Sequence, residues 1–204
     1  ARHSQGVEHE LQLLDDKFFT SPELALSSSD EAIATMARLA CAGADSAMGT
    51  LGAYDRAVIE TVQENEQSID MLADAVNNYL VRLSGHMEAD DNSVLLNYYL
   101  QCFSEFERIG DYAVNLTESA EELHARGAQF STTARQELAV LQGALHEIMD
   151  YAADAFTAPH NRFWQGSLRE HRAYEAALHQ RFAAMLEIAQ PDHLPRRAFA
   201  ALHR

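Results

Sequence analysis

The strongest constraint on the fold is a series of long segments rich in Ala, Leu, Glu, Gln and Arg, without runs of β-branched residues. These segments predict helices at about 21–49, 53–84, 93–126 and 133–158. In the second segment, apolar residues recur at steps of three, four and seven, which is typical of a helix packed in a bundle. At 1.5 Å per residue, the second and third helices are each about 45 Å long. Helices of that length joined by short loops pack antiparallel, in an up-down bundle.

The order of these segments predicts an all-α protein built from two three-helix units. The first unit is expected at 21–127 and the second, incomplete one at 128–204. The second is incomplete because a helix at 161–190 is followed only by one short helix from Pro195. Residues 1–20 show no clear hydrophobic period and are predicted to be a flexible N-terminal segment.

The charge balance excludes some classes of partner. The chain has 31 acidic and 15 basic residues, with a formal net charge of −16 at pH 7, so it repels nucleic acid. The acids are concentrated in residues 1–159, with 27 acids and 8 bases, a net charge of −19. Residues 160–204 have 4 acids and 7 bases, a net charge of +3, and can face a partner or the rest of the chain.

Hydropathy and the first residue bear on the context of the chain. No apolar run approaches the roughly 20 residues needed to span a bilayer, so we expect no direct membrane insertion by this chain. Because it begins with Ala1 and not with Met, we expect it to be processed or to be part of a longer protein.

Two pairs of acids are candidates for metal binding: Glu66 with Asp70, and Glu107 with Asp111. A spacing of four places both carboxylates of a pair on one side of a helix, where like charges repel by a few tenths of a kcal/mol. A divalent cation removes that repulsion and prefers hard oxygen ligands. If the two helices are neighbours, the pairs form a patch of four carboxylates.

The spacing alone does not distinguish a metal site from a solvated acidic surface. Acids occupy 31 of 204 positions, and the chain contains six acid–acid pairs four residues apart. Chance gives about five such pairs, so the number is not significant. Both candidate pairs lie off the apolar stripes of their helices, which suits either interpretation.

Three residues near the second pair strengthen the metal hypothesis. Gly110 lies inside a long helix, where it costs about 1 kcal/mol relative to Ala, and indicates a close approach by a neighbouring helix or a ligand. Arg108 can hold a carboxylate or an oxyanion. Asn115 lies one turn beyond Asp111 and offers a neutral oxygen ligand in line with the pair.

The stretch from Phe106 to Asn115, FERIGDYAVN, resembles the signature on the third helix of PhoU-like domains, and 66–70, EQSID, resembles the first acidic motif of that family. The resemblance implies two three-helix bundles with surface metal ions. It also implies a regulatory role in phosphate homeostasis and no enzymatic activity. Carried over by position, a divalent or trivalent metal ion would be held by Glu66, Asp70, Glu107 and Asp111, with Asn115 as a helper.

A second resemblance concerns the N-terminal region. Residues 14–22, LDDKFFTSP, with Ala25 and Leu26, are similar to the segment leading into the PhoU-like tail of bacterial sodium/phosphate cotransporters. This implies a membrane-embedded phosphate transporter portion as partner and a cytoplasmic location at the inner face of the membrane. A homodimer is also compatible with the sequence. The resemblance weakens beyond residue 126, and 161–190 contains no acid–acid pair, so we expect no second metal cluster.

Two alternatives stay open. A carboxylate-bridged di-metal enzyme needs Glu-x-x-His on two helices, and the chain offers one such tetrad, from Glu121 to His124. A free-standing helical adaptor needs the acids only for solubility. The adaptor predicts no response of thermal stability to added metal, whereas binding to the native state raises it.

Overall fold

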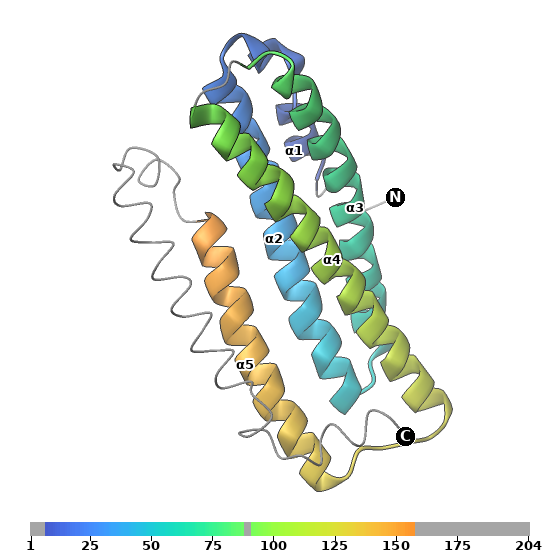
Figure 1. The fold of residues 1–204 in the computed structure, drawn as a ribbon. Helices are drawn as coiled ribbons and strands as arrows, with labels where there is room; N and C mark the ends of the chain where they lie inside the picture. Colours follow the sequence, from blue (N-terminus) through green and yellow to red (C-terminus); the bar gives the residue numbers. More distant parts are fainter. Residues whose placement is uncertain (1–6, 88–90, 158–204) are drawn as a thin grey trace.

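The computed structural model describes residues 7–87 and 91–157 (Figure 1). The described elements are α1 (Glu8–Leu13), the 3₁₀ helix η2 (Asp16–Thr20), α2 (Pro22–Gly52), α3 (Arg56–Ser84), α4 (Asp91–Ala125) and α5 (Thr132–Thr157). Consecutive long helices run antiparallel, and the expected all-α bundle is confirmed. The division into two units at residue 127 stays a prediction, and the helices expected at 161–190 and from Pro195 lie outside the described residues.

Helix α2 lies at the centre of the described fold and packs against α3, α4 and α5. Figure 1 shows it between α5 and the pair formed by α3 and α4. Its sequence explains this position, because small side chains let several helices approach one backbone closely. The fully buried positions of α2 include five alanines: Ala25, Ala32, Ala37, Ala40 and Ala47.

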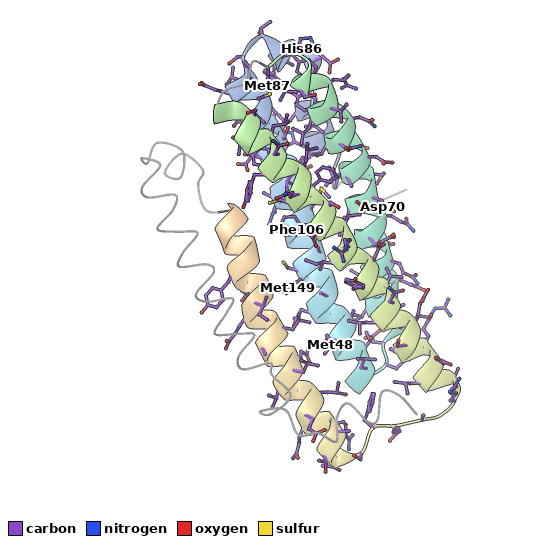
Figure 2. All side chains as sticks on the ribbon, viewed as in Figure 1. Met48, Asp70, His86, Met87, Phe106 and Met149 are labelled. Atoms are coloured by element: carbon purple, nitrogen blue, oxygen red, sulfur yellow. The ribbon has the colours of Figure 1, made fainter. Side chains whose placement is uncertain are left out.

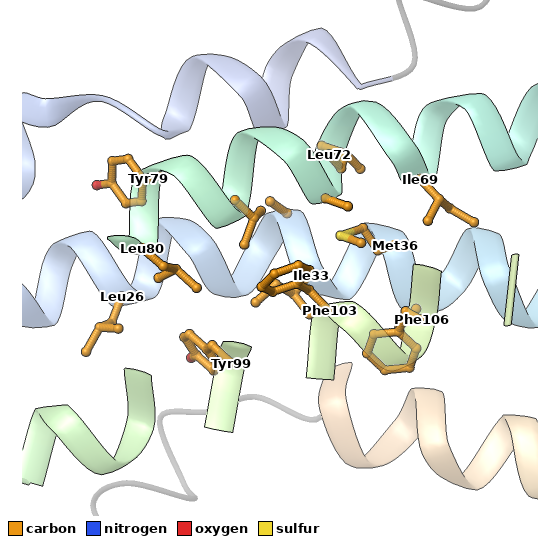
Figure 3. Close-up of a cluster of buried hydrophobic side chains, with 14 of the residues drawn as sticks. Leu26, Ile33, Met36, Ile69, Leu72, Tyr79, Leu80, Tyr99, Phe103 and Phe106 are labelled. Carbon is orange, nitrogen blue, oxygen red and sulfur yellow. The ribbon is translucent and has the colours of Figure 1, made fainter. Parts of the chain in front are cut away.

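The main core is formed by larger side chains from α2, α3 and α4 (Figure 3). Ile33 and Met36 of α2 are fully buried, as are Leu72 and Tyr79 of α3. Phe103 of α4 belongs to the same cluster. Burying each such side chain contributes about 1.5–3 kcal/mol. The apolar stripes predicted for the long helices therefore meet in one continuous core.

The N-terminal segment corrects one expectation. Residues 8–20 were expected to lack regular structure, but they form α1 and η2, which pack against α2 and α3. The ring of Phe19 lies 5.0 Å from that of Tyr79, and Arg82 Nη2 lies 2.8 Å from Asp16 Oδ1. The Tyr79 hydroxyl donates a hydrogen bond to the carbonyl of Asp15 at 3.3 Å. Long-range contacts, and not local periodicity, hold this segment.

Helix α5 packs chiefly against α2 within the described part of the chain. Its buried anchor is Met149, which joins Ala44 and Ala47 in a small second cluster. The Cys41 thiol donates a hydrogen bond to the carbonyl of Met149 at 3.4 Å, and burial raises the pKa of that thiol to about 11. No helix in residues 7–87 and 91–157 has the length and hydropathy needed to cross a membrane.

Gly110 marks the place where α3 and α4 come close together. A Cβ atom at this position would lie 3.1 Å from Cδ1 of Ile69, which is 1% exposed. Contacts this short are rare for real Cβ atoms, and the surrounding core limits how far Ile69 can move. The close approach expected from a glycine inside a helix is therefore confirmed, and the neighbour is α3.

We predict opposite effects of Gly110→Ala in two backgrounds, measured by urea denaturation. In the wild type, overpacking costs about 1–3 kcal/mol and exceeds the gain in helix propensity of about 1 kcal/mol, so the variant is less stable. In an Ile69→Val background, which lacks Cδ1, the same change should raise the free energy of unfolding. An equal effect in both backgrounds would show that Ile69 does not set the helix separation.

Candidate metal centre

Two acidic pairs are positioned by the crossing of α3 and α4. Glu66 and Asp70 lie on α3, and Glu107 and Asp111 lie on α4, so the pairs flank the contact between Ile69 and Gly110 described above. Glu66 and Glu107 are partly buried, whereas Asp70 and Asp111 are exposed. Figure 2 shows Asp70 on α3, with Phe106 on the neighbouring α4.

The charges of the two pairs influence each other across the boundary between α3 and α4. The pKa of Glu66 is raised by burial, then by the charge of Asp70 and a hydrogen bond with it, and also by the charge of Asp111 on α4. The pKa of Glu107 is raised by burial and by the charges of Asp70 on α3 and Asp111. Glu66 is therefore within electrostatic range of Asp111, and Glu107 is within range of Asp70. The four carboxylates singled out in the sequence lie on two adjacent helices.

Asp74 is a further acid at this site that the sequence reasoning did not single out. It lies one turn beyond Asp70 on α3, and its charge also raises the pKa of Glu107. The signal was present in the sequence, since Glu66, Asp70 and Asp74 follow one another at steps of four on one helix. The acidic ladder of α3 is therefore one turn longer than the ladder of α4.

Arg108 and Asn115, which the sequence also connected with this site, lie beside the acidic pairs on α4. Arg108 does not reach across to α3: its Nη1 lies 3.1 Å from Glu105 Oε2, and its Nη2 donates a hydrogen bond to the Tyr112 hydroxyl at 3.5 Å. Arg108 does hold a carboxylate, as expected, but that carboxylate belongs to Glu105 of the same helix. Asn115 is exposed and lies one turn beyond Asp111 on α4.

The arrangement supplies the right donors for a hard cation. As the side chains stand, no group of three or more His, Cys, Asp or Glu in residues 7–87 and 91–157 is placed so that it could hold a metal ion. The donor set nevertheless fits such an ion, because carboxylate oxygens are the preferred ligands of hard divalent cations. A positive charge placed beside Glu66 and Glu107 would also offset the neighbouring negative charges that, after burial, raise the pKa values of these two residues.

We expect the raised pKa values to appear in the pH dependence of stability. Glu66 and Glu107 titrate above the usual Glu value of 4.5, so the folded protein holds these protons more tightly than the unfolded chain. Their contribution to stability is therefore full below that value and is lost as the pH rises through the folded-state pKa values.

The corresponding measurement is urea denaturation of metal-free protein between neutral pH and pH 4.5. On acidification, the free energy of unfolding of the wild type should rise relative to that of the double variant Glu66→Gln, Glu107→Gln, since the variant lacks both titrating groups. The same change in the free energy of unfolding for both proteins would contradict the coupling between the two helices.

Comparison with known proteins places this site in a family context. The PhoU domain family matches residues 33–120, a range that includes both acidic pairs and most of α2, α3 and α4. No curated protein and no solved structure matched the chain in the same comparisons. The match suggests a role in the regulation of phosphate homeostasis. Residues 33–120 of this chain are therefore similar to a PhoU domain.

Proposed function

We propose that this chain is a regulatory, metal-binding module in phosphate uptake. A divalent or trivalent metal ion is held between α3 and α4 by Glu66, Asp70, Glu107 and Asp111. One observation carries the proposal: in the region that matches the PhoU domain family, the two acidic pairs flank the close contact between Ile69 of α3 and Gly110 of α4. Because the family match supports regulation and not catalysis, we assign no reaction to this site.

The chain's own residues suit a cation-dependent clamp. Without a cation, the carboxylates on α3 and α4 repel one another across the contact between Ile69 and Gly110. The bound ion supplies the positive charge that offsets this repulsion. Glu66 and Glu107 are partly buried and Asp70 and Asp111 are exposed, so the ion would bind at the surface of the helix pair. Binding therefore stabilises the packing of α3 on α4.

The proposed partner is the membrane-embedded portion of a sodium/phosphate cotransporter, with this module at the cytoplasmic face of the membrane. The support is the similarity of residues 14–22 to the segment that leads into the PhoU-like tail of those transporters. In the structure, this region lies against one end of α3 through Phe19 and Asp16. In this proposal, residues 14–22 link α3 to the membrane-embedded portion of the transporter.

Metal titration tests the proposed site. We expect Mn²⁺ to bind the wild type in isothermal titration calorimetry and to raise its melting temperature, since a ligand of the native state stabilises it. The double variant Glu107→Ala, Asp111→Ala should lose both responses. The matched control is Glu118→Ala, Glu122→Ala, which removes an acid pair of equal spacing from the same helix.

The control separates a specific site from general acidity. Retained binding in the control, with loss in the Glu107 and Asp111 variant, supports the site. Equal loss in both variants, or no binding of Mn²⁺, Mg²⁺ or Fe³⁺ by the wild type, would leave the helical adaptor without metal as the better description.

The transporter context has a separate test in the reading frame upstream of Ala1. Membrane-spanning segments in the same frame are the expected result. A start codon immediately before Ala1 would instead favour a free-standing regulator and would leave the metal site untouched.

A further inference from the structure

Helix α5 carries a histidine that lies between two carboxylates, one on α2 and one on α5 itself. His146 Nδ1 lies 3.6 Å from Oδ1 of Asp45 on α2, and His146 Nε2 lies 3.3 Å from Oδ2 of Asp150, one turn further along α5. The Gln142 side chain also reaches α2, because its Nε2 lies 3.5 Å from the carbonyl oxygen of Asp45. His146 is therefore part of the polar contact between α5 and α2.

The other groups at this contact are acidic, weakly polar or apolar. Cys41 lies one turn before Asp45 on α2, and its pKa is raised by burial and then by the charge of Asp150, which is therefore within electrostatic range of α2. The neighbouring α3 and α4 contribute the apolar side chains of Val62 and Ala113 to the cluster beneath this contact. Within residues 7–87 and 91–157, the imidazole is the one basic group paired with either aspartate.

The two carboxylates distinguish the protonated form of the ring from the neutral form. A protonated imidazole carries a positive charge and an N–H group at each nitrogen, whereas a neutral imidazole has an N–H group at one nitrogen and a lone pair at the other. In either neutral tautomer, one of the two aspartates faces the nitrogen that lacks a proton, and two electron-rich atoms oppose each other. The position of His146 between Asp45 and Asp150 therefore suits the charged ring at both nitrogens.

We propose that His146 is a proton-dependent clamp that holds α5 on α2. Asp150 orients the protonated ring on α5, and Asp45 pairs with it on α2. Loss of the proton removes the attraction between the two helices, and α5 is then held by the apolar cluster around Met149 and by neutral hydrogen bonds. Because histidine changes charge between about pH 5 and pH 8, docking of α5 is stronger at pH 6 and weaker at pH 8. The clamp is independent of the proposed metal site, which lies on α3 and α4.

The two cysteines allow a test in the full chain. The Cys41 thiol donates a hydrogen bond to the carbonyl of Met149 on α5 at 3.4 Å, so it becomes more accessible when α5 moves away from α2. Cys102 packs against the main core and is an internal reference, because burial raises the pKa of each thiol to about 11. The ratio of the rates at which N-ethylmaleimide labels Cys41 and Cys102 therefore removes the effect of pH that the two thiols share.

We expect this ratio, measured by mass spectrometry, to rise about two- to tenfold from pH 6 to pH 8 in the wild type, as the loss of exposed ion pairs allows. His146→Gln and Asp45→Asn should each remove the rise, because the first lacks the titrating ring and the second lacks the carboxylate on α2. The matched control is His9→Gln, since His9 on α1 lies 3.9 Å from a single carboxylate, that of Glu31. The control should keep the wild-type rise.

Three results would overturn the proposal. The first is a wild-type labelling ratio that stays constant or falls between pH 6 and pH 8. The second is a rise of wild-type size in His146→Gln or in Asp45→Asn, because the pH dependence would then belong to other groups. The third is loss of the rise in His9→Gln, because removal of any exposed histidine would then have the same effect.

Discussion

The close packing of α3 against α4 is the constraint on which the proposed chemistry depends. Gly110 lacks a Cβ atom, which would lie only 3.1 Å from Cδ1 of Ile69, so the two helices can approach closely at this point. The same crossing fixes the acids on either side of it, because Glu66 and Glu107 are one rigid helix turn or less from the contact. A residue that carries no functional group thus sets the electrostatic environment of residues that do.

A second constraint is the alanine-rich surface of α2. Large side chains at Ala37, Ala40 or Ala47 would push one of the surrounding helices away, and each of these positions is fully buried. The large apolar residues that fill the core come from both α2 and its neighbours. The central helix therefore has small side chains at some turns, where neighbouring helices come close, and large apolar side chains at others, where they fill the core. This explains how one helix packs against three others.

Much of this arrangement could be predicted from the sequence because it depends on the spacing of residues along single helices. The four long helices follow from their apolar periods, and the placement of Glu66 with Asp70 on one side of α3 follows from a step of four. The close approach at Gly110 was also predictable, because glycine is costly inside a helix. The identity of its neighbour, Ile69, was not, because that depends on how two helices cross.

The features that escaped prediction depend on contacts between distant segments. α1 and η2 are too short to show a period, and their positions depend on pairs such as Phe19 with Tyr79. Arg108 pairs with Glu105 of its own helix, and the sequence did not show which carboxylate it would pair with. The effect of Asp74 on Glu107 becomes visible only once α3 and α4 are placed side by side.

The most direct test of the central claim is a crystal structure of the protein grown with Mn²⁺, with anomalous diffraction data collected to locate the metal. A single anomalous peak, or a group of peaks, between α3 and α4 and within coordination distance of carboxylate oxygens from both helices is the expected result. Peaks confined to other acidic surfaces, or peaks bound by one helix alone, would contradict the claim that the two acidic ladders act together.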